Sequence, residues 1–246
     1  MPAEKLKDDP IVEALLEIKF ESGELDEVVT GRLSDIPFWK NSPKTRLGAA
    51  DIPAAIRRAD ENLRFAPTVE VKGFASANYL ARIGSNVLSI HCTAPYIGWE
   101  TFFPLVSRVV DELYVAVPNS RVLRLGLRYV NVFTSDRHGI KSVYDLALKI
   151  ALAETHLDKP INLNFRTTPS DQHECMTRIA SIEFLAGNLP PNPAAAVDID
   201  VSSPVNFHAD TANAVKGWIE NAHTHEKQAF LNLLPEKLHL QLKRTD

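Results

Sequence analysis

Hydrophobic and polar residues alternate along residues 11–20, which read IVEALLEIKF. One face of this segment would carry Val12, Ala14, Leu16, Ile18 and Phe20, and the other face would carry Glu13, Glu17 and Lys19 together with Ile11 and Leu15. A period of two is typical of a strand that buries one face. The pattern therefore predicts a half-buried strand near the start of the chain.

The segment 121–133, RVLRLGLRYVNVF, alternates in the same way. Its apolar face would carry Leu123, Leu125, Leu127, Tyr129 and Phe133. Arg124 and Arg128 would share the opposite face with Gly126. We therefore predict a second half-buried strand in the middle of the chain.

Other patterns predict the remaining elements. Apolar residues spaced by three and four positions after Trp99 and after Thr211 predict two long amphipathic helices, the second capped by Asp210 or Thr211 and interrupted at Pro235. The other predicted helices span 25–33, 52–59 and 142–153, and the other predicted strands span 68–75, 79–83, 87–92, 161–168, 176–186 and 195–202.

The order strand, helix, three strands, helix therefore occurs twice, in residues 10–117 and 121–242. Trp99 and Trp218 recur at corresponding places in the two long helices. We predict one α+β domain over residues 1–246, built from tandem β-α-β-β-β-α repeats that form a curved antiparallel sheet backed by two long helices. Helices on one face leave the other face to solvent, a ligand or a partner.

Composition narrows the classes of function. The chain of 246 residues has 27 basic and 31 acidic residues and a net charge of -4, with no basic cluster, which disfavours a nucleic-acid binder. Its two cysteines, Cys92 and Cys175, have no metal-binding spacing and fit a reducing compartment. Neither a signal peptide nor an apolar run long enough for a membrane span is visible, so we predict a cytoplasmic protein.

Four segments together resemble a known family: PIVEALLEIKF, YIGWETF, LGLRYVNVF and VDIDV, the last followed by the helix WIENAHTHEKQAFLNLL. The family is a sporadically distributed group of bacterial proteins of about this length, with no assigned function. The resemblance implies no particular chemistry. The sporadic distribution of the group implies an association with mobile or defence genes.

The segment AVDIDVSS contains two aspartates, Asp198 and Asp200, that would point to the same side of a strand. Two adjacent carboxylates can hold Mg²⁺ or Mn²⁺ through oxygen ligands. The same pattern also describes a solvated strand face on which arginines from neighbouring strands balance the charge. The sequence favours the second interpretation, because a lone pair of aspartates is a weak metal signal.

The other strands predict more charge on this polar face. In addition to the aspartates it would carry Glu13, Glu17, Arg82, His91, Arg124, Arg128 and Glu183. These residues can form a ladder of exposed ion pairs. They can instead line a site for a polar ligand or a protein partner, in which Arg124 and Arg128 hold a carboxylate or phosphate.

Motifs for catalysis are missing from the sequence. It contains no GxSxG nucleophile motif and no glycine-rich phosphate loop. Cys92 is expected to be buried and unreactive. His223 is expected to be a packed, hydrogen-bonded core residue, whereas His225 and Glu226 are expected at the surface.

Two hypotheses of function follow. The first is a non-catalytic binding or interaction protein, without a cofactor, that uses Glu17, Arg82, His91, Arg124, Arg128, Asp198 and Asp200 to bind a protein or a small polar ligand, as a monomer or a homodimer. The second is an enzyme that acts on a phosphorylated or nucleotide substrate with Mg²⁺ or Mn²⁺ bound to Asp198 and Asp200. The missing motifs favour the first.

Overall fold

A computed structural model describes residues 3–6, 8–150, 159–187 and 189–245 of the chain. In this part of the chain the fold is α+β, with one large open antiparallel sheet and six α-helices. The strands of the large sheet are β2 (Ile11–Glu21), β3 (Lys44–Arg46), β4 (Val69–Lys72), β5 (Tyr79–Ile83), β6 (Val87–Thr93), β7 (Arg121–Thr134), β8 (Asn162–Ser170), β9 (His173–Ser181) and β10 (Pro193–Ser202).

The helices contain fewer residues in total than the strands, although two of the helices are long. They are α1 (Asp26–Ser34), α2 (Ala54–Ala59), α3 (Trp99–Ala116), α4 (Ser135–His138), α5 (Ala212–Leu233) and α6 (Glu236–His239), with 3₁₀ turns η1 (Gly48–Asp51), η2 (Val143–Asp145) and η3 (Ile182–Phe184). Two further strands, β1 (Ala3–Leu6) and β11 (Leu242–Thr245), pair with each other and bring the two ends of the chain together.

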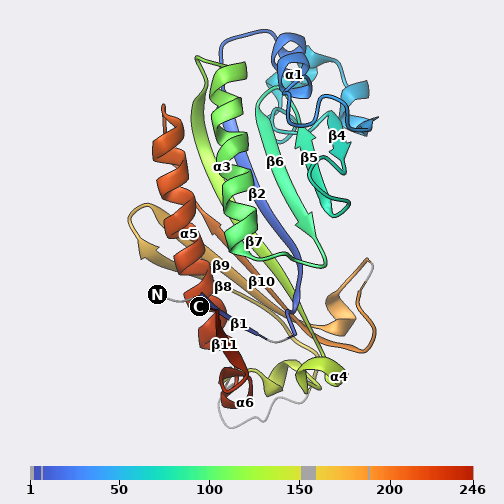
Figure 1. Ribbon diagram of the computed structural model, residues 1–246, viewed down its shortest axis with the longest axis vertical. Helices are drawn as coiled ribbons and strands as arrows, with labels where there is room; N and C mark the ends of the chain where they lie inside the picture. The colour runs from blue at the N-terminus through green and yellow to red at the C-terminus, as the bar shows by residue number, and fades with distance from the viewer. Residues whose placement is uncertain (1–2, 7, 151–158, 188, 246) are drawn as a thin grey trace.

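The strand order in the large sheet is β3-β4-β5-β6-β2-β7-β10-β9-β8. Strands β2 and β7, the two segments with the clearest alternation, lie side by side at its centre (Figure 1). Strands from the first half of the chain continue on one side of this pair, and strands from the second half continue on the other side.

Helices α3 and α5 contact each other and lie next to each other in front of the sheet (Figure 1), with α5 against β7, β9 and β10. The apolar stripe of α3 is buried: Phe102, Val106, Val109, Val110 and Leu113. On α5 the buried apolar residues are Val215, Trp218, Ile219, Ala222 and Leu233. The side chain of Thr211 caps α5 by accepting a hydrogen bond from the Ala214 amide.

The structure corrects three predictions about elements. Residues 142–153 do not form the predicted helix in their described part: only η2 is helical, residues 146–150 are irregular, and 151–158 lie outside the described residues. Strand β9 begins earlier than predicted and ends at Ser181, so Glu183 lies in the turn η3 instead of on a strand face. The strand is shorter at this end than its apolar pattern suggested, because the chain turns into η3 directly after Ser181.

The third correction concerns the face of Leu123. The register between β2 and β7 shifts between Lys19 and Phe20, which pair with Arg124 and Val122 respectively. This bulge adds Leu123 as an extra residue, so Val122 faces the core, whereas Leu123 is half-buried on the other side. A period-two pattern cannot reveal a bulge, because one extra residue moves every side chain beyond it to the opposite face.

Candidate functional site

The sheet has one face turned away from α3 and α5, which we call the open face. On the central strands, buried apolar residues alternate with residues that point to this face. All the site residues predicted from the sequence lie on it: Glu17, Arg82, His91, Arg124, Arg128, Asp198 and Asp200. The register therefore brings the predicted charges to one surface, but it does not place them in one cluster.

Arg128 and Asp198 form a bidentate ion pair at the centre of the open face. The Arg128 guanidinium donates from Nε to Asp198 Oδ1 at 2.7 Å and from Nη2 to Asp198 Oδ2 at 2.5 Å. These hydrogen bonds raise the pKa of Arg128. Both oxygens of Asp198 are therefore engaged, although the residue directly across the ladder from Arg128 is Asp200.

Asp200 is in a different environment from Asp198. Burial raises the pKa of the Asp200 carboxyl, and the nearby charges of Arg124 and Arg128 act in the opposite direction. Among the described residues, no hydrogen bond or ion pair reaches this carboxylate. The two aspartates thus do not act as an equivalent pair of metal ligands, and in the described ranges no group of three or more His, Cys, Asp or Glu side chains could hold a metal ion.

Further charges on the open face are paired within the chain. The His91 Nδ1 lies 2.8 Å from Glu13 Oε1, and its Nε2 lies 3.0 Å from Ser89 Oγ. The hydrogen bond from His91 lowers the pKa of Glu13. Arg82 Nε donates to Glu70 at 3.0 Å. Both ring nitrogens of His91 are therefore engaged within the chain, whereas Arg82 uses one of its five N–H donors on Glu70.

Basic side chains gather at one end of the open face, around a groove of about 580 Å³. Lys19 comes from β2, Arg124 from β7, Arg166 from β8 and Arg64 from the segment after α2. We call the site that these four residues define the basic groove. Two acidic residues, Glu61 and Glu174, also line it, so positive charge exceeds negative charge there.

The walls of the basic groove include an aromatic ring that positions two of the cations. Lys19 Nζ lies 5.2 Å and the Arg64 guanidinium 4.7 Å from the centre of the Phe65 ring. Arg166 Nη1 donates to Glu174 at 3.2 Å, whereas Arg124 Nη1 reaches Glu17 only at 3.8 Å. Arg124 therefore keeps most of its donors free in the geometry observed.

Sequence reasoning identified Arg124 but missed Lys19, Arg64 and Arg166 as partners in this site. Lys19 and Arg166 occupy polar-face positions of strands that the alternation predicted, so their side could be inferred from the sequence. Arg64 lies in a segment without a periodic pattern, and no sequence signal places it against the sheet. The convergence depends on long-range strand order, which local patterns do not contain.

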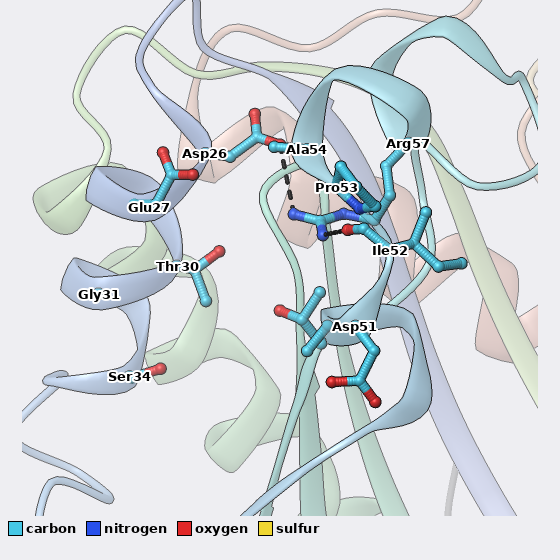
Figure 2. A pocket seen from close by; sticks show the side chains of 12 residues that line it. Asp26, Glu27, Thr30, Gly31, Ser34, Asp51, Ile52, Pro53, Ala54 and Arg57 are labelled. Carbon is cyan, nitrogen blue, oxygen red and sulfur yellow. Dashed lines mark hydrogen bonds and ion pairs between the residues drawn. The ribbon is translucent and has the colours of Figure 1, made fainter.

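A second pocket lies between α1 and α2, with a volume of about 490 Å³. Figure 2 shows the Arg57 guanidinium between the Asp26 carboxylate and the carbonyl of Ile52. Arg57 donates to the Ile52 oxygen at 2.5 Å and lies 3.5 Å from Asp26 Oδ2. These contacts hold α2 and the turn before it against α1, which indicates a structural role for Arg57.

Two titratable residues of α5, Glu226 and His223, lie on the helix side of the sheet. Glu226 was expected at the surface but is only 5 % exposed, because the inward-facing stripe of α5 includes it. His223 packs as expected, with its ring stacked on Trp99 at 3.9 Å, but its Nδ1 has no hydrogen-bond partner among the described residues. The expectation of a hydrogen bond at this nitrogen was wrong.

Comparison with known proteins gives no family assignment. No protein-family model matches the chain, and no curated protein matches it in sequence. None of the helices in the described ranges is both long enough and apolar enough to cross a membrane. The resemblance to the sporadically distributed bacterial family therefore stays a prediction, and the geometry of the open face carries the functional argument.

Proposed function

We propose that this chain is a non-catalytic binding protein that holds a small polar anion, such as a phosphate-bearing molecule, in the basic groove. One observation carries the proposal: four cations from four separate segments converge in a single groove, although the net charge of the chain is -4. Scattered surface charges would not be expected to concentrate in this way.

The chemistry of the basic groove suits an anion with several oxygens. A guanidinium presents five N–H donors in a planar fork that matches a phosphate or carboxylate. Arg124 is only weakly engaged by Glu17. Arg64 packs on Phe65 and forms no ion pair with a carboxylate of the described residues. These two guanidinium groups can therefore exchange water for a ligand without breaking a strong internal ion pair.

The rest of the open face favours binding over catalysis. Arg128 engages both oxygens of Asp198, and His91 uses both of its ring nitrogens within the chain. For the metal-dependent alternative, Asp198 would have to give up both hydrogen bonds to Arg128 before it could bind Mg²⁺ or Mn²⁺ with Asp200. No observation favours that exchange.

We further propose that residues 10–117 and 121–242 are tandem repeats, with α3 and α5 backing the sheet. The strand order supports this proposal, since each half contributes its strands in the same sequence outwards from the central β2–β7 pair. The assignment to the bacterial cytoplasm, and to a mobile or defence-associated system, rests on the family resemblance and belongs to the same proposal.

Calorimetric titration with pyrophosphate tests the anion site. We expect Arg124→Gln combined with Arg64→Gln to weaken binding at least about tenfold, because a hydrogen bond to a charged group contributes about 1.5–3 kcal/mol. Thermal unfolding provides a second measurement: pyrophosphate at about 100 times its Kd should add about 2.7 kcal/mol of stability to the wild type.

Arg82→Gln is the matched control, because it removes one positive charge from the same face at a residue that is already paired with Glu70. We expect its affinity for pyrophosphate to stay within about twofold of the wild type at physiological salt, where charges more than about 8 Å apart are largely screened. Equal losses in the control and in the groove variants, or no binding by the folded wild type, would contradict the proposal.

A further inference from the structure

A third pocket, lined mainly by rings, lies on the helix side of the sheet and is separate from the basic groove. It has a volume of about 560 Å³ and lies between residues 214–225 of α5, the turn from β8 to β9, and the loop that follows β10. Its rings come from five residues: Trp218, His173, Phe207, His208 and His225. We call this site the ring pocket.

The rings of this pocket are packed against one another. The Trp218 and His173 rings lie 4.9 Å apart and nearly parallel, at 16°. Phe207 lies 6.2 Å from Trp218, and His225 lies 4.9 Å from His173. Aromatic rings at these separations attract one another, so the wall is formed before any ligand enters.

Hydrogen bonds determine which ring nitrogen of His173 carries the proton. Its Nε2 lies 3.2 Å from the Trp218 carbonyl oxygen, which only accepts, so Nε2 carries the proton. Its Nδ1 therefore accepts from the Ser170 hydroxyl at 2.8 Å. Burial lowers the pKa of this imidazole, which keeps it neutral. The Trp218 ring nitrogen donates to the Gln172 carbonyl at 2.8 Å, so the indole is also fully engaged.

Asn221 and His225 are available for a ligand. They lie one turn apart on the same side of α5, and both line the ring pocket. Neither side chain makes a hydrogen bond to another described residue. Each can both donate and accept. Among the described residues that line the pocket, none carries a carboxylate, an ammonium or a guanidinium group.

Gly217 leaves one side of the pocket open. It lies inside α5, where glycine is the least favourable residue apart from proline. Packing does not require it, because a Cβ atom at this position would meet nothing within 4 Å. A larger side chain at residue 217 would instead project into the space between α5 and the ring wall.

We propose that the ring pocket binds an uncharged planar heteroaromatic molecule of nucleobase or nucleoside size. Its ring would lie against the half-buried Phe207 and His225, and its polar edge would exchange hydrogen bonds with Asn221 and His225. Pockets of about 300–1,000 Å³ that combine apolar walls with a few polar groups are typical small-molecule sites. This ligand chemistry differs from that of the basic groove and does not depend on it.

Ligand-observed NMR with adenosine, guanosine, cytidine and uridine tests the proposal on the full chain. At least one of the four should bind the wild type at concentrations up to about 1 mM. Gly217→Leu should fill the pocket and weaken that binding at least about tenfold, and Asn221→Ala should weaken it about three- to tenfold through the lost hydrogen bond.

Gly31→Leu is the matched control, because Gly31 also lies in a helix with open space at its Cβ position but lines the pocket between α1 and α2. Nucleoside binding should be unchanged in this variant and in Arg124→Gln, which separates the ring pocket from the anion site. If none of the four nucleosides binds the folded wild type, or if Gly217→Leu binds as tightly as the wild type, the proposal is wrong.

Discussion

Two titratable residues one turn apart on α5, His223 and Glu226, point into the buried region between the helices and the sheet. Burial lowers the pKa of His223 to about 4 and raises the pKa of Glu226 to about 8. Near Glu226 lie the hydroxyl groups of Tyr96 and Tyr129, which are 3.2 Å from each other. Both α5 residues are therefore neutral at pH 7 in the folded chain, and they titrate outside their ordinary ranges.

Their effects on stability have opposite signs. The unfolded chain loses the Glu226 proton near pH 4.5 but the folded chain keeps it to about pH 8, so stability falls as pH rises through this window. The unfolded chain binds a proton on His223 near pH 6.5 but the folded chain resists until about pH 4, so stability falls as pH decreases through that window. The two slopes oppose each other between about pH 4.5 and 6.5.

We expect Glu226→Gln to flatten the decline in unfolding free energy between pH 6.5 and 8, where only Glu226 of this pair titrates, at up to about 1.4 kcal/mol per pH unit. Between pH 4.5 and 6.5 the variant should gain stability with pH more steeply than the wild type, because the His223 slope is no longer opposed. Urea unfolding at a series of pH values measures both windows. Parallel curves for the two proteins would show that Glu226 ionises at its ordinary pKa.

Arg57 and Arg58 both contact Asp26, so comparing them tests how strongly burial changes the contribution of such a contact to stability. Both lie near Asp26, at 3.5 and 3.3 Å, but the Arg57 side chain is 12 % exposed and the Arg58 side chain is 53 % exposed. Arg57 also donates to the carbonyls of Ile52 and Ala49. We expect Arg57→Ala to lower the unfolding free energy by about 2–4 kcal/mol and Arg58→Ala by less than about 1 kcal/mol.

Chemical denaturation of the two variants under one buffer condition checks this difference directly. The two substitutions remove the same charge and nearly the same volume from adjacent residues, so each serves as the control for the other. Similar losses would mean that the carbonyl hydrogen bonds of Arg57 contribute little, and that its buried position is not the source of stability.

At the level of elements, the bulge in β7 shows that strand pairing, and not only the local hydrophobic pattern, determines which side chains are buried. Alternation predicted Leu123 in the core, but the register shift opposite Lys19 and Phe20 buries Val122 and turns Leu123 toward the basic groove. We expect Val122→Ser to cost about 2–4 kcal/mol through lost burial and cavity formation, and Leu123→Ser to cost less than about 1 kcal/mol. Thermal unfolding of the two variants measures the contrast, and a larger loss for Leu123→Ser would place the bulge elsewhere.

Most elements occur close to their predicted bounds, including the shorter elements α1, β6 and β8. Strands β2, β5 and β7 and helices α3 and α5 occur within one or two residues of their predicted bounds, because burial of one face determines their pattern. The helix predicted over residues 142–153 failed in its described part. There the chain forms η2 and then continues irregularly, and the Ala147 amide donates to the Leu233 carbonyl at the end of α5. A tertiary contact of this kind overrides local propensity.

At the level of the whole molecule, the sequence placed the charged residues on one face but did not locate the site within it. Among the predicted residues, Arg128 pairs with Asp198, and His91 pairs with Glu13 and Ser89. The basic groove arises where β8, far along the chain from β2, brings Arg166 to the same end of the sheet as Lys19. That proximity follows from the order of nine strands, which no local spacing encodes.

The central pairing of β2 with β7 also predicts how the molecule unfolds. Ile83 on β5 and Ile199 on β10 belong to opposite halves of the chain, yet one continuous cluster of buried side chains includes both. We expect Ile199→Ala to lower the unfolding free energy by about 2–4 kcal/mol. Because the core is shared, the most protected amides of β5 and β6 should lose as much protection as those of β9 and β10.

Native-state hydrogen exchange of the wild type and of Ile199→Ala measures this loss of amide protection in both halves. Ile83→Ala supplies the reciprocal experiment from the other half. Equal losses in both halves, for either substitution, are the result expected of one cooperative domain. Loss confined to the substituted half would mean that the two halves unfold separately, and that the β2–β7 ladder joins two domains instead of passing through the middle of one.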